Sequence, residues 1–483
     1  MKKTKYFIFA AAAALFAACS SDDGLAPEKQ QIAQTGQVPV VFDTYVNRTT
    51  RAGYHGDINA VGTLQTADVK GFGVFGYYTD NNDYDQFSIP NFMYNQQVTY
   101  ESDTWTYSPV KYWPNEYGST AISEDYDRVT FFAYAPYVEV TPATGKVNTS
   151  STKTANPTET TGIVGMSSNT GSGDPMVKYV VSLAPATKVD LLWGVKAAGD
   201  WKITQTNTAQ TGLTVGFPWI NVQRPADATT SQKLLFDFKH ALAKLNVQID
   251  ADVDKASGHD NEVATDNKIF VRSITFTGFA TKGALNLNNT DAGAGVAKWM
   301  SFNCVNELEA GEEITIYDGR KDGKEGVSEA SNEKVKGLNP VIIENGNWTA
   351  VNVANKGVSK TAVNLFEPTS SLATDELKLA DPIYVIPTGE AVDVTIVYEV
   401  EAADANLPTV LADGATKGSK IKNTITKKAV IAKLENGKDY TLKIHLGMNS
   451  VKFDANVTKW DTPATETDVY LPSNTPSSAP VRR

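Results

Sequence analysis

Residues 392–400 read VDVTIVYEV, and this stretch decides the fold class. Val392, Val394, Ile396 and Tyr398 alternate with residues that are mostly polar. Because successive side chains of a β-strand point to opposite faces, this period of two predicts a strand with one apolar face. Similar short runs, rich in Val, Phe, Tyr, Trp and Thr, recur along the chain with turn residues between them. The sequence therefore predicts an all-β protein built from β-sandwiches.

The expected strands fall into two blocks, separated by a change of composition at residues 220–232. We therefore expect two β-sandwich domains in tandem, an N-terminal one over residues 38–228 and a C-terminal one over residues 229–483. The length of 483 residues is sufficient for two domains. The segments 141–176 and 305–375 are rich in small and polar residues, and we expect both to form loops on the surface.

The first 18 residues have the pattern of an export signal. Three lysines precede an apolar run from Phe7 to Ala18, which at about 1.5 Å per residue is too short to span a bilayer. The junction of Ala18 and Cys19 resembles the lipobox of bacterial lipoproteins, which implies cleavage between these two residues and lipidation of Cys19. The alternative is an ordinary secretory signal followed by an incidental cysteine. Residues 19–37 are expected to form a flexible tether.

Charge and cysteine content restrict the function further. The formal net charge is −11, and no basic run is present, which argues against a nucleic-acid partner. Cys304 is the second of only two cysteines. If Cys19 carries a lipid, Cys304 has no partner within the chain, and we expect no intramolecular disulfide.

The sequence predicts no catalytic residue, metal site or cofactor. The four histidines are not at metal-type spacing, and we expect them to be structural; they are His55, His240, His259 and His445. The acidic run DNNDYDQ at residues 80–86 lacks the glycine and glutamate of an EF-hand loop, so an acidic turn is expected. No nucleophile-elbow or phosphate-binding glycine motif is present. Four tryptophans are typical of a core, although they leave open a sugar-stacking platform; they are Trp105, Trp113, Trp193 and Trp219.

A set of short pieces, in order, resembles the fimbrillin family of Bacteroidota, the Mfa-like and FimA-like pilus subunits. After the lipobox, the pieces are RTTRAG (48–53), FGVFGYY (72–78), VKYWP (110–114), VTFFAYAPY (129–137), DLLWG (190–194), FDFKHALAKLNV (236–247), IYVIPTG (383–389) and YTLKIHLGMNSVKFDANVTKW (440–460). The residues SSDDG (20–24) also resemble the acidic signal that directs lipoproteins of Bacteroidota to the cell surface.

This resemblance implies two transthyretin-like β-sandwich domains and a structural, non-enzymatic role in a surface fimbrium, the type V pilus. It implies an outer-membrane lipoprotein that a trypsin-like protease cuts after an arginine in the loop behind the first strand, where Arg48 and Arg51 are the candidates. The cut removes the lipid anchor together with the first strand, VPVVFDTYV at 38–46. A strand from another fimbrial subunit then fills the vacant position, and the donor is expected in the carboxyl-terminal region.

Several alternatives remain open at this stage. Arg48 and Arg51 are also compatible with ordinary solvated loop residues, and a chain that keeps its lipid would serve as the anchor of the pilus. A surface glycan-binding lipoprotein of a polysaccharide-uptake system is the main alternative function. The sequence does not distinguish stalk, tip, accessory and anchor subunits, nor does it name a receptor on a host or bacterial surface.

Overall fold

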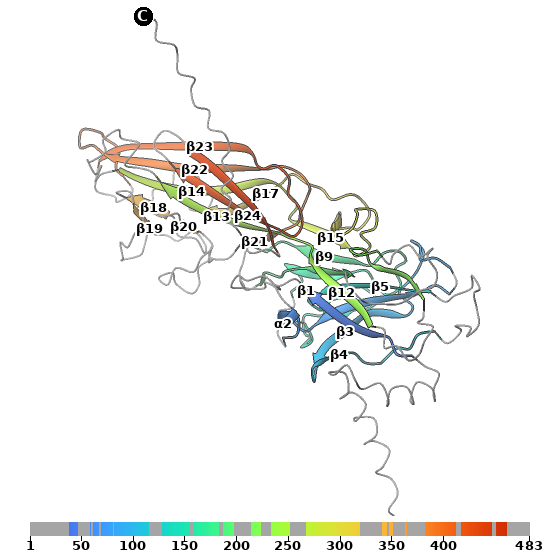
Figure 1. Ribbon diagram of the computed structural model, residues 1–483. Coiled ribbons are helices and arrows are strands. Elements are labelled where there is room, and N and C mark those ends of the chain that lie inside the picture. The colour runs from blue at the N-terminus through green and yellow to red at the C-terminus, as the bar shows by residue number, and fades with distance from the viewer. Residues whose placement is uncertain are drawn as a thin grey trace, which may run out of the picture.

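The computed structural model shows an elongated, almost entirely β protein with two halves arranged end to end (Figure 1). It describes residues 38–46, 58, 61–66, 69–80, 82–114, 128–154, 158–182, 187–197, 214–223, 233–251, 267–318, 341–344, 347–350, 363–364, 382–411, 417–446 and 451–460. A short helix, α2 (Val61–Leu64), packs near the first strand. Within these ranges, no helix has the length and hydrophobicity needed to cross a bilayer. The all-β prediction is confirmed.

The first half is built around an eight-stranded sheet. Its order is β1 (Val41–Val46), β12 (Lys233–His240), β10 (Leu192–Lys196), β5 (Arg128–Ala135), β2 (Phe72–Tyr78), β3 (Met93–Glu101) and β4 (Thr104–Thr106), and β11 (Trp219–Gln223) pairs with β5. The expected first strand is therefore present, and it pairs in parallel with β12, far along the chain.

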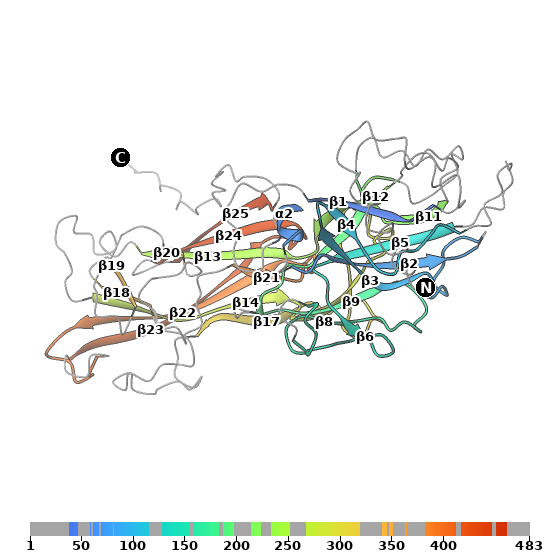
Figure 2. The same ribbon diagram turned by 90° about the horizontal axis from the view of Figure 1, so that it is seen from below.

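The two ends of this sheet meet. The N–H of Val40 donates to the carbonyl of Lys111 at 2.9 Å, and the N–H of Trp113 donates to the carbonyl of Val38 at 2.8 Å. The residues before β1 are therefore hydrogen-bonded to the segment after β4. Figure 2 shows β1 beside β12, its partner in the sheet. The sheet packs around an apolar core to which Phe42 belongs, and β1 itself is the last strand at one end of the order.

A second sheet covers the other face of the first. Its order is β16 (Lys298–Met300), β15 (Lys282–Asn286), β9 (Met176–Val180), β8 (Gly162–Met166), β7 (Lys146–Val147) and β6 (Val140–Thr141). Residues 141–176 were expected to be a surface loop, and this expectation is wrong. Val147, Ile163 and Met166 are buried in a second core because β7 and β8 lie within this segment, despite its many polar residues.

The second half contains two further sheets. One has the order β20 (Val363–Asn364), β13 (Ala243–Ala251), β24 (Lys438–Leu446) and β25 (Val451–Lys459), with β21 (Ile383–Val385) paired to β13. The other has the order β19 (Asn347–Ala350), β18 (Val341–Glu344), β14 (Asn267–Phe279), β22 (Val392–Ala403) and β23 (Gly418–Ile431), with β17 (Glu312–Asp318) paired to β14. The segment 305–375 thus supplies strands as well as loops.

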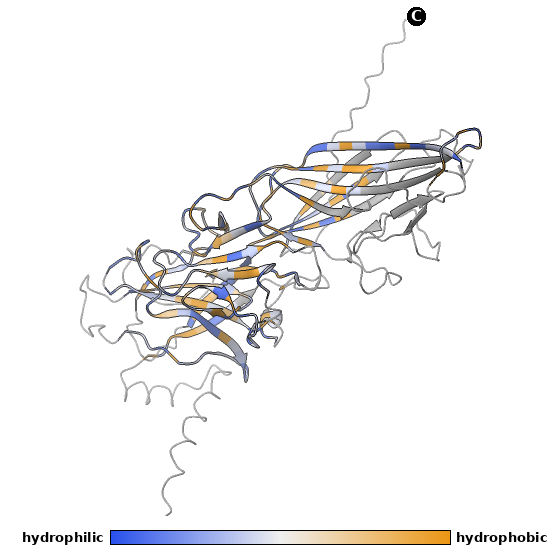
Figure 3. Ribbon diagram, turned by 180° about the vertical axis from the view of Figure 1, so that it is seen from behind, coloured by the Kyte–Doolittle hydropathy of each residue, from blue (hydrophilic) through white to orange (hydrophobic). Residues whose placement is uncertain are grey.

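The alternation in residues 392–400 has the predicted result, because Val392, Val394, Ile396 and Tyr398 are all buried in β22. By contrast, β23 is an edge strand that is more hydrophilic than its neighbours (Figure 3). Its exposed side chains include four lysines, namely Lys420, Lys422, Lys427 and Lys428.

Strand pairing crosses the expected boundary near residue 228. β12 and β15 follow residue 228 in sequence but pair with strands that precede it, and β16, which also follows residue 228, pairs with β15. The division into residues 38–228 and 229–483 stays a prediction. If each half folds as a unit, we propose that these three strands belong to the first.

Candidate functional site

The first strand lies at the edge of its sheet with one apolar face turned into the core. Val38, Val40 and Phe42 are at most 6% exposed, whereas Pro39 and Val41 between them are half-buried. This alternation follows directly from the period of two in the sequence. The prediction that these three side chains fill an apolar site on one face is confirmed.

Phe42 is the centre of this contact. Its ring lies 5.4 Å from Tyr107, 5.9 Å from Phe131 and 5.9 Å from Phe236 between centroids, and 6.5 Å from Phe72. We call these four residues, together with the backbone of Lys111–Trp113, the β1 site. The rings come from three strands and from the segment after β4, so they converge on Phe42 from different directions.

Polar contacts fix the strand at its start. The hydroxyl of Tyr107 donates to the carbonyl of Val40 at 2.7 Å, beside the backbone hydrogen bonds to Lys111 and Trp113. Burial raises the pKa of Tyr107 well above its usual range, so the hydroxyl keeps its proton as a donor. Further along, Lys233 of β12 lies 3.5 Å from the carboxylate of Asp43. Because both side chains are partly exposed, this ion pair contributes little to stability.

Ile58, the next described residue after β1, is held in place by buried contacts. Ile58 is buried, and its backbone N–H donates to Asp190 at 3.2 Å. The same carboxylate lies 2.9 Å from Nδ1 of His240, and both side chains are almost completely buried. Arg48 and Arg51, the candidate cleavage residues, fall between Val46 and Ile58 and lie outside the described residues. Ala18 and Cys19 also lie outside them.

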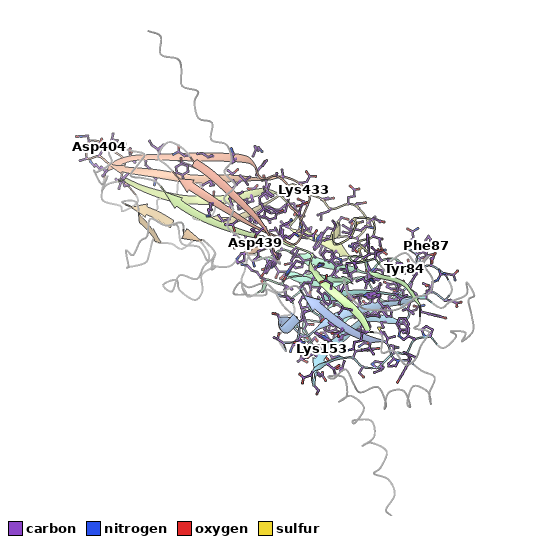
Figure 4. All side chains as sticks on the ribbon, viewed as in Figure 1. Tyr84, Phe87, Lys153, Asp404, Lys433 and Asp439 are labelled. Atoms are coloured by element: carbon purple, nitrogen blue, oxygen red, sulfur yellow. The ribbon has the colours of Figure 1, made fainter. Side chains whose placement is uncertain are left out.

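The tryptophans and the acidic turn that the sequence singled out have structural roles. The four tryptophans that left open a sugar-binding platform are buried in the core, and they are Trp105, Trp113, Trp193 and Trp219. The acidic turn is held by hydrogen bonds, since Asp83 pairs with Arg128 and the hydroxyl of Tyr84 donates to Asp174 at 3.0 Å. Figure 4 places Tyr84 and the exposed Phe87 at the end of the molecule opposite Asp404.

The single described cysteine does not suggest reactivity. Cys304 is half-buried and makes no disulfide. Burial raises the pKa of its thiol, which keeps it in the less nucleophilic protonated form. Of the expected structural histidines, His240 is buried against Asp190. His55 and His259 lie outside the described residues, as does the side chain of His445.

Sequence reasoning missed three parts of this site. Tyr107 follows Trp105 at the strand period, which is the signal that its ring faces the same core. Asp190 and Ile58 gave no signal, because each is a single residue whose partner is distant in the sequence. The site as a whole binds an extended strand through backbone hydrogen bonds and apolar contacts, and it contains no arrangement for bond-breaking chemistry among the described residues.

Comparison with known proteins finds fimbrial proteins among the similar ones. No protein-family profile matches the chain. The fimbrium subunit Fim1C of Phocaeicola vulgatus is 26% identical over 241 residues, which are 47% of this chain and 48% of that protein. The chain is similar in sequence to this fimbrium subunit. The matched region spans about half the length of this curated fimbrillin.

A solved fimbrial structure is also similar to this chain. The crystal structure of a fimbrial protein from Bacteroides vulgatus is 20% identical, and the alignment covers 87% of this chain and 99% of that one with a TM-score of 0.48. Because this score is below 0.5, the fold described above does not depend on it. The family expected from the ordered sequence pieces is confirmed by the sequence relative.

Proposed function

We propose that the protein is a structural subunit of a surface fimbrium that polymerises by donor-strand exchange. The observation that carries the proposal is that β1 is an edge strand whose apolar face fills the β1 site. A strand in this position can be replaced by another chain without refolding the rest of the sheet. Its polymer partners are other fimbrial subunits, and an adhesive role toward a host or bacterial surface is compatible with this placement.

The energetics of the site support exchange. Burying Val38, Val40 and Phe42 stabilises by about 1.5–3 kcal/mol each, or roughly 5–9 kcal/mol together before the entropy of ordering the strand is subtracted. That amount is comparable to the net stability of a whole domain, about 5–15 kcal/mol. Loss of β1 also leaves one edge of β12 unpaired, which is a template for a new strand. Refilling the site from a neighbouring subunit is therefore strongly favourable.

Proteolysis provides the trigger in this proposal. The segment between Val46 and Ile58 carries Arg48 and Arg51, and the contacts of Ile58 fasten the chain immediately beyond it. A cut after either arginine separates β1 from the body while the chain from Ile58 onward stays fixed. Before the cut, Cys19 holds the protein at the outer membrane as a lipoprotein, and the fimbrium is its location afterwards.

The carboxyl-terminal region contains a matching donor. When residues 467–473 (TDVYLPS) are aligned with residues 38–44 (VPVVFDT), Val469 takes the position of Val40 and Leu471 that of Phe42. We propose this register for the incoming strand. It places apolar side chains in the two central positions of the β1 site.

Trypsin digestion of the folded, mature protein tests the function. We expect a new amino terminus at Thr49 or Ala52, and a ladder of oligomers on a gel run without boiling. Substitution of both arginines by alanine should abolish the cut and the ladder together. A uniform monomer that is cut at scattered loops contradicts the proposal.

A pair of donor variants tests the register. Leu471→Asp places a charge in the apolar site and should prevent the ladder while leaving the cut unchanged, because burying an unpaired charge is very costly. Tyr470→Asp places the same charge on the opposite face of the strand and should polymerise normally. Equal behaviour of the two variants contradicts the register.

The four tryptophans that left open a sugar-stacking platform do not support the glycan-binding alternative. The four tryptophans are buried in the core of the first half, where their faces are not available to a sugar.

A further inference from the structure

β12 connects the β1 site to the junction between the two halves. Phe236 and Phe238, near its middle, pack in the core that contains Phe42. His240, its last residue, is 2% exposed and belongs to the junction instead. The centre of this strand therefore contacts β1, while its end contacts the second half of the molecule.

At the junction, His240 stacks on Trp460. The two rings are 3.9 Å apart between centroids and nearly parallel, with an interplanar angle of 7°. Trp460 also stacks on Tyr384 of β21 at 5.4 Å, and its backbone N–H donates to the carbonyl of Gly437 at 2.9 Å. Asn436, next to Gly437, donates from its side chain to the carbonyl of His240 at 3.3 Å. The ring of His240 is thus held between Asp190 of the first half and Trp460 of the second.

The same histidine is also linked, through Asp190, to Ile58, which follows the segment that carries Arg48 and Arg51. Asp190 binds Nδ1 of His240 and also accepts the N–H of Ile58. Trp460 follows β25 directly and precedes residues 461–483, which contain the donor proposed above. The buried pair of Asp190 and His240 therefore lies at the end of β12 and contacts both Ile58 and Trp460, the residue that precedes the proposed donor region.

We propose that His240 couples occupancy of the β1 site to the position of Trp460, the residue that directly follows β25. The proposal rests on the function proposed above. When β1 leaves, β12 loses its parallel partner and the contact of Phe236 with Phe42. A packed strand transmits such a change along its length, because the interior has no free space to absorb it. The flat stack on Trp460 is sensitive to a small shift of the imidazole.

This coupling gives polymer growth an order. A subunit that still contains its own β1 holds Trp460 in place, and a subunit that has lost β1 loosens the packing around Trp460.

Hydrogen exchange of the full-length protein tests the coupling without protease. Phe42→Ala loosens β1 within the intact chain, and Val98→Ala is the matched control, because Val98 is buried in the same core on β3, with three strands between β3 and β12. We expect Phe42→Ala to speed exchange in residues 451–460 by about tenfold, within the usual range of coupling between sites, and Val98→Ala to leave those residues unchanged. If Phe42→Ala disturbs the fold too widely, Tyr107→Phe removes a single hydrogen bond to β1 and should produce a smaller change of the same kind.

His240→Asn identifies the path. Asparagine keeps a donor toward Asp190 and removes the ring that stacks on Trp460. In this background Phe42→Ala should still speed exchange in β12, but exchange in residues 451–460 should no longer respond. The coupling is refuted if β12 responds and residues 451–460 do not in the otherwise unchanged protein, or if they respond equally with and without His240. Polymerisation after trypsin digestion is measured separately, so failure of the proposed function does not imitate either result.

Discussion

Replacement of Phe42 by alanine should destabilise the first half strongly. The ring is 2% exposed and lies within 6.5 Å of four other aromatic rings. Deleting a buried phenylalanine ring costs about 3–5 kcal/mol. We expect about 4 kcal/mol, because the surrounding rings belong to several separate segments and cannot close the cavity together. This lowers the folding equilibrium constant about a thousandfold.

Urea denaturation followed by near-ultraviolet circular dichroism measures this change. The midpoint of the transition that reports the first half should fall while its slope stays the same, since a changed slope would indicate loss of two-state behaviour. Phe87→Ala is the matched control, because Phe87 is 73% exposed and its loss should change stability by no more than about 0.5 kcal/mol. If Phe42→Ala costs no more than Phe87→Ala, β1 does not fill the core as described and the strand-exchange argument fails.

Three further predictions follow from single contacts. Tyr107→Phe removes the hydrogen bond to the β1 backbone and should cost about 1–2 kcal/mol, seen as a lower urea midpoint and a faster trypsin cut behind β1; an unchanged cutting rate contradicts it. The pKa of Glu139 is lowered, first by its hydrogen bond from the Ser151 hydroxyl, so its contribution to stability is present above the ordinary carboxylate pKa and is lost as the pH falls through the lowered value. The difference in urea midpoint between the unchanged protein and Glu139→Gln should therefore shrink between neutral and strongly acidic pH, and a constant difference argues against the assignment. Gly71 has φ +76°, and a Cβ there would lie 2.0 Å from the carbonyl oxygen of Val98, so Gly71→Ala should lower the thermal midpoint by an amount equivalent to about 2 kcal/mol or more; a midpoint equal to that of the unchanged protein excludes this backbone conformation.

Local patterns in the sequence predicted the strands and their buried faces. The alternation around Val394 and around Val40 identified the inward residues correctly, because the period of two is a property of each strand alone. The ordered pieces also identified the family. The strand predictions concern features that a dozen consecutive residues determine, whereas the resemblance rests on the order of pieces along most of the chain.

Pairing between distant strands was not predictable in this way. β1 pairs with β12, and paired residues such as Val41 and Lys233 are far apart in the sequence. No local pattern encodes that register. Residues 141–176 were misjudged because their polar composition outweighed a few apolar residues, such as Ile163, that the fold buries. Likewise, the contact between Asp190 and His240 depends on two elements meeting in space.

The lysines of β23 have a consequence for how many molecules assemble. An unprotected edge strand invites another edge to pair with it, and lysines on the edge oppose this by bringing like charges together. In the proposed fimbrium, two filaments that approached sideways along β23 would bring these lysines face to face, although Lys428 already pairs with Asp393 at 2.6 Å. The assembly should therefore lengthen without thickening, and the cell would carry separate threads in place of fused ribbons.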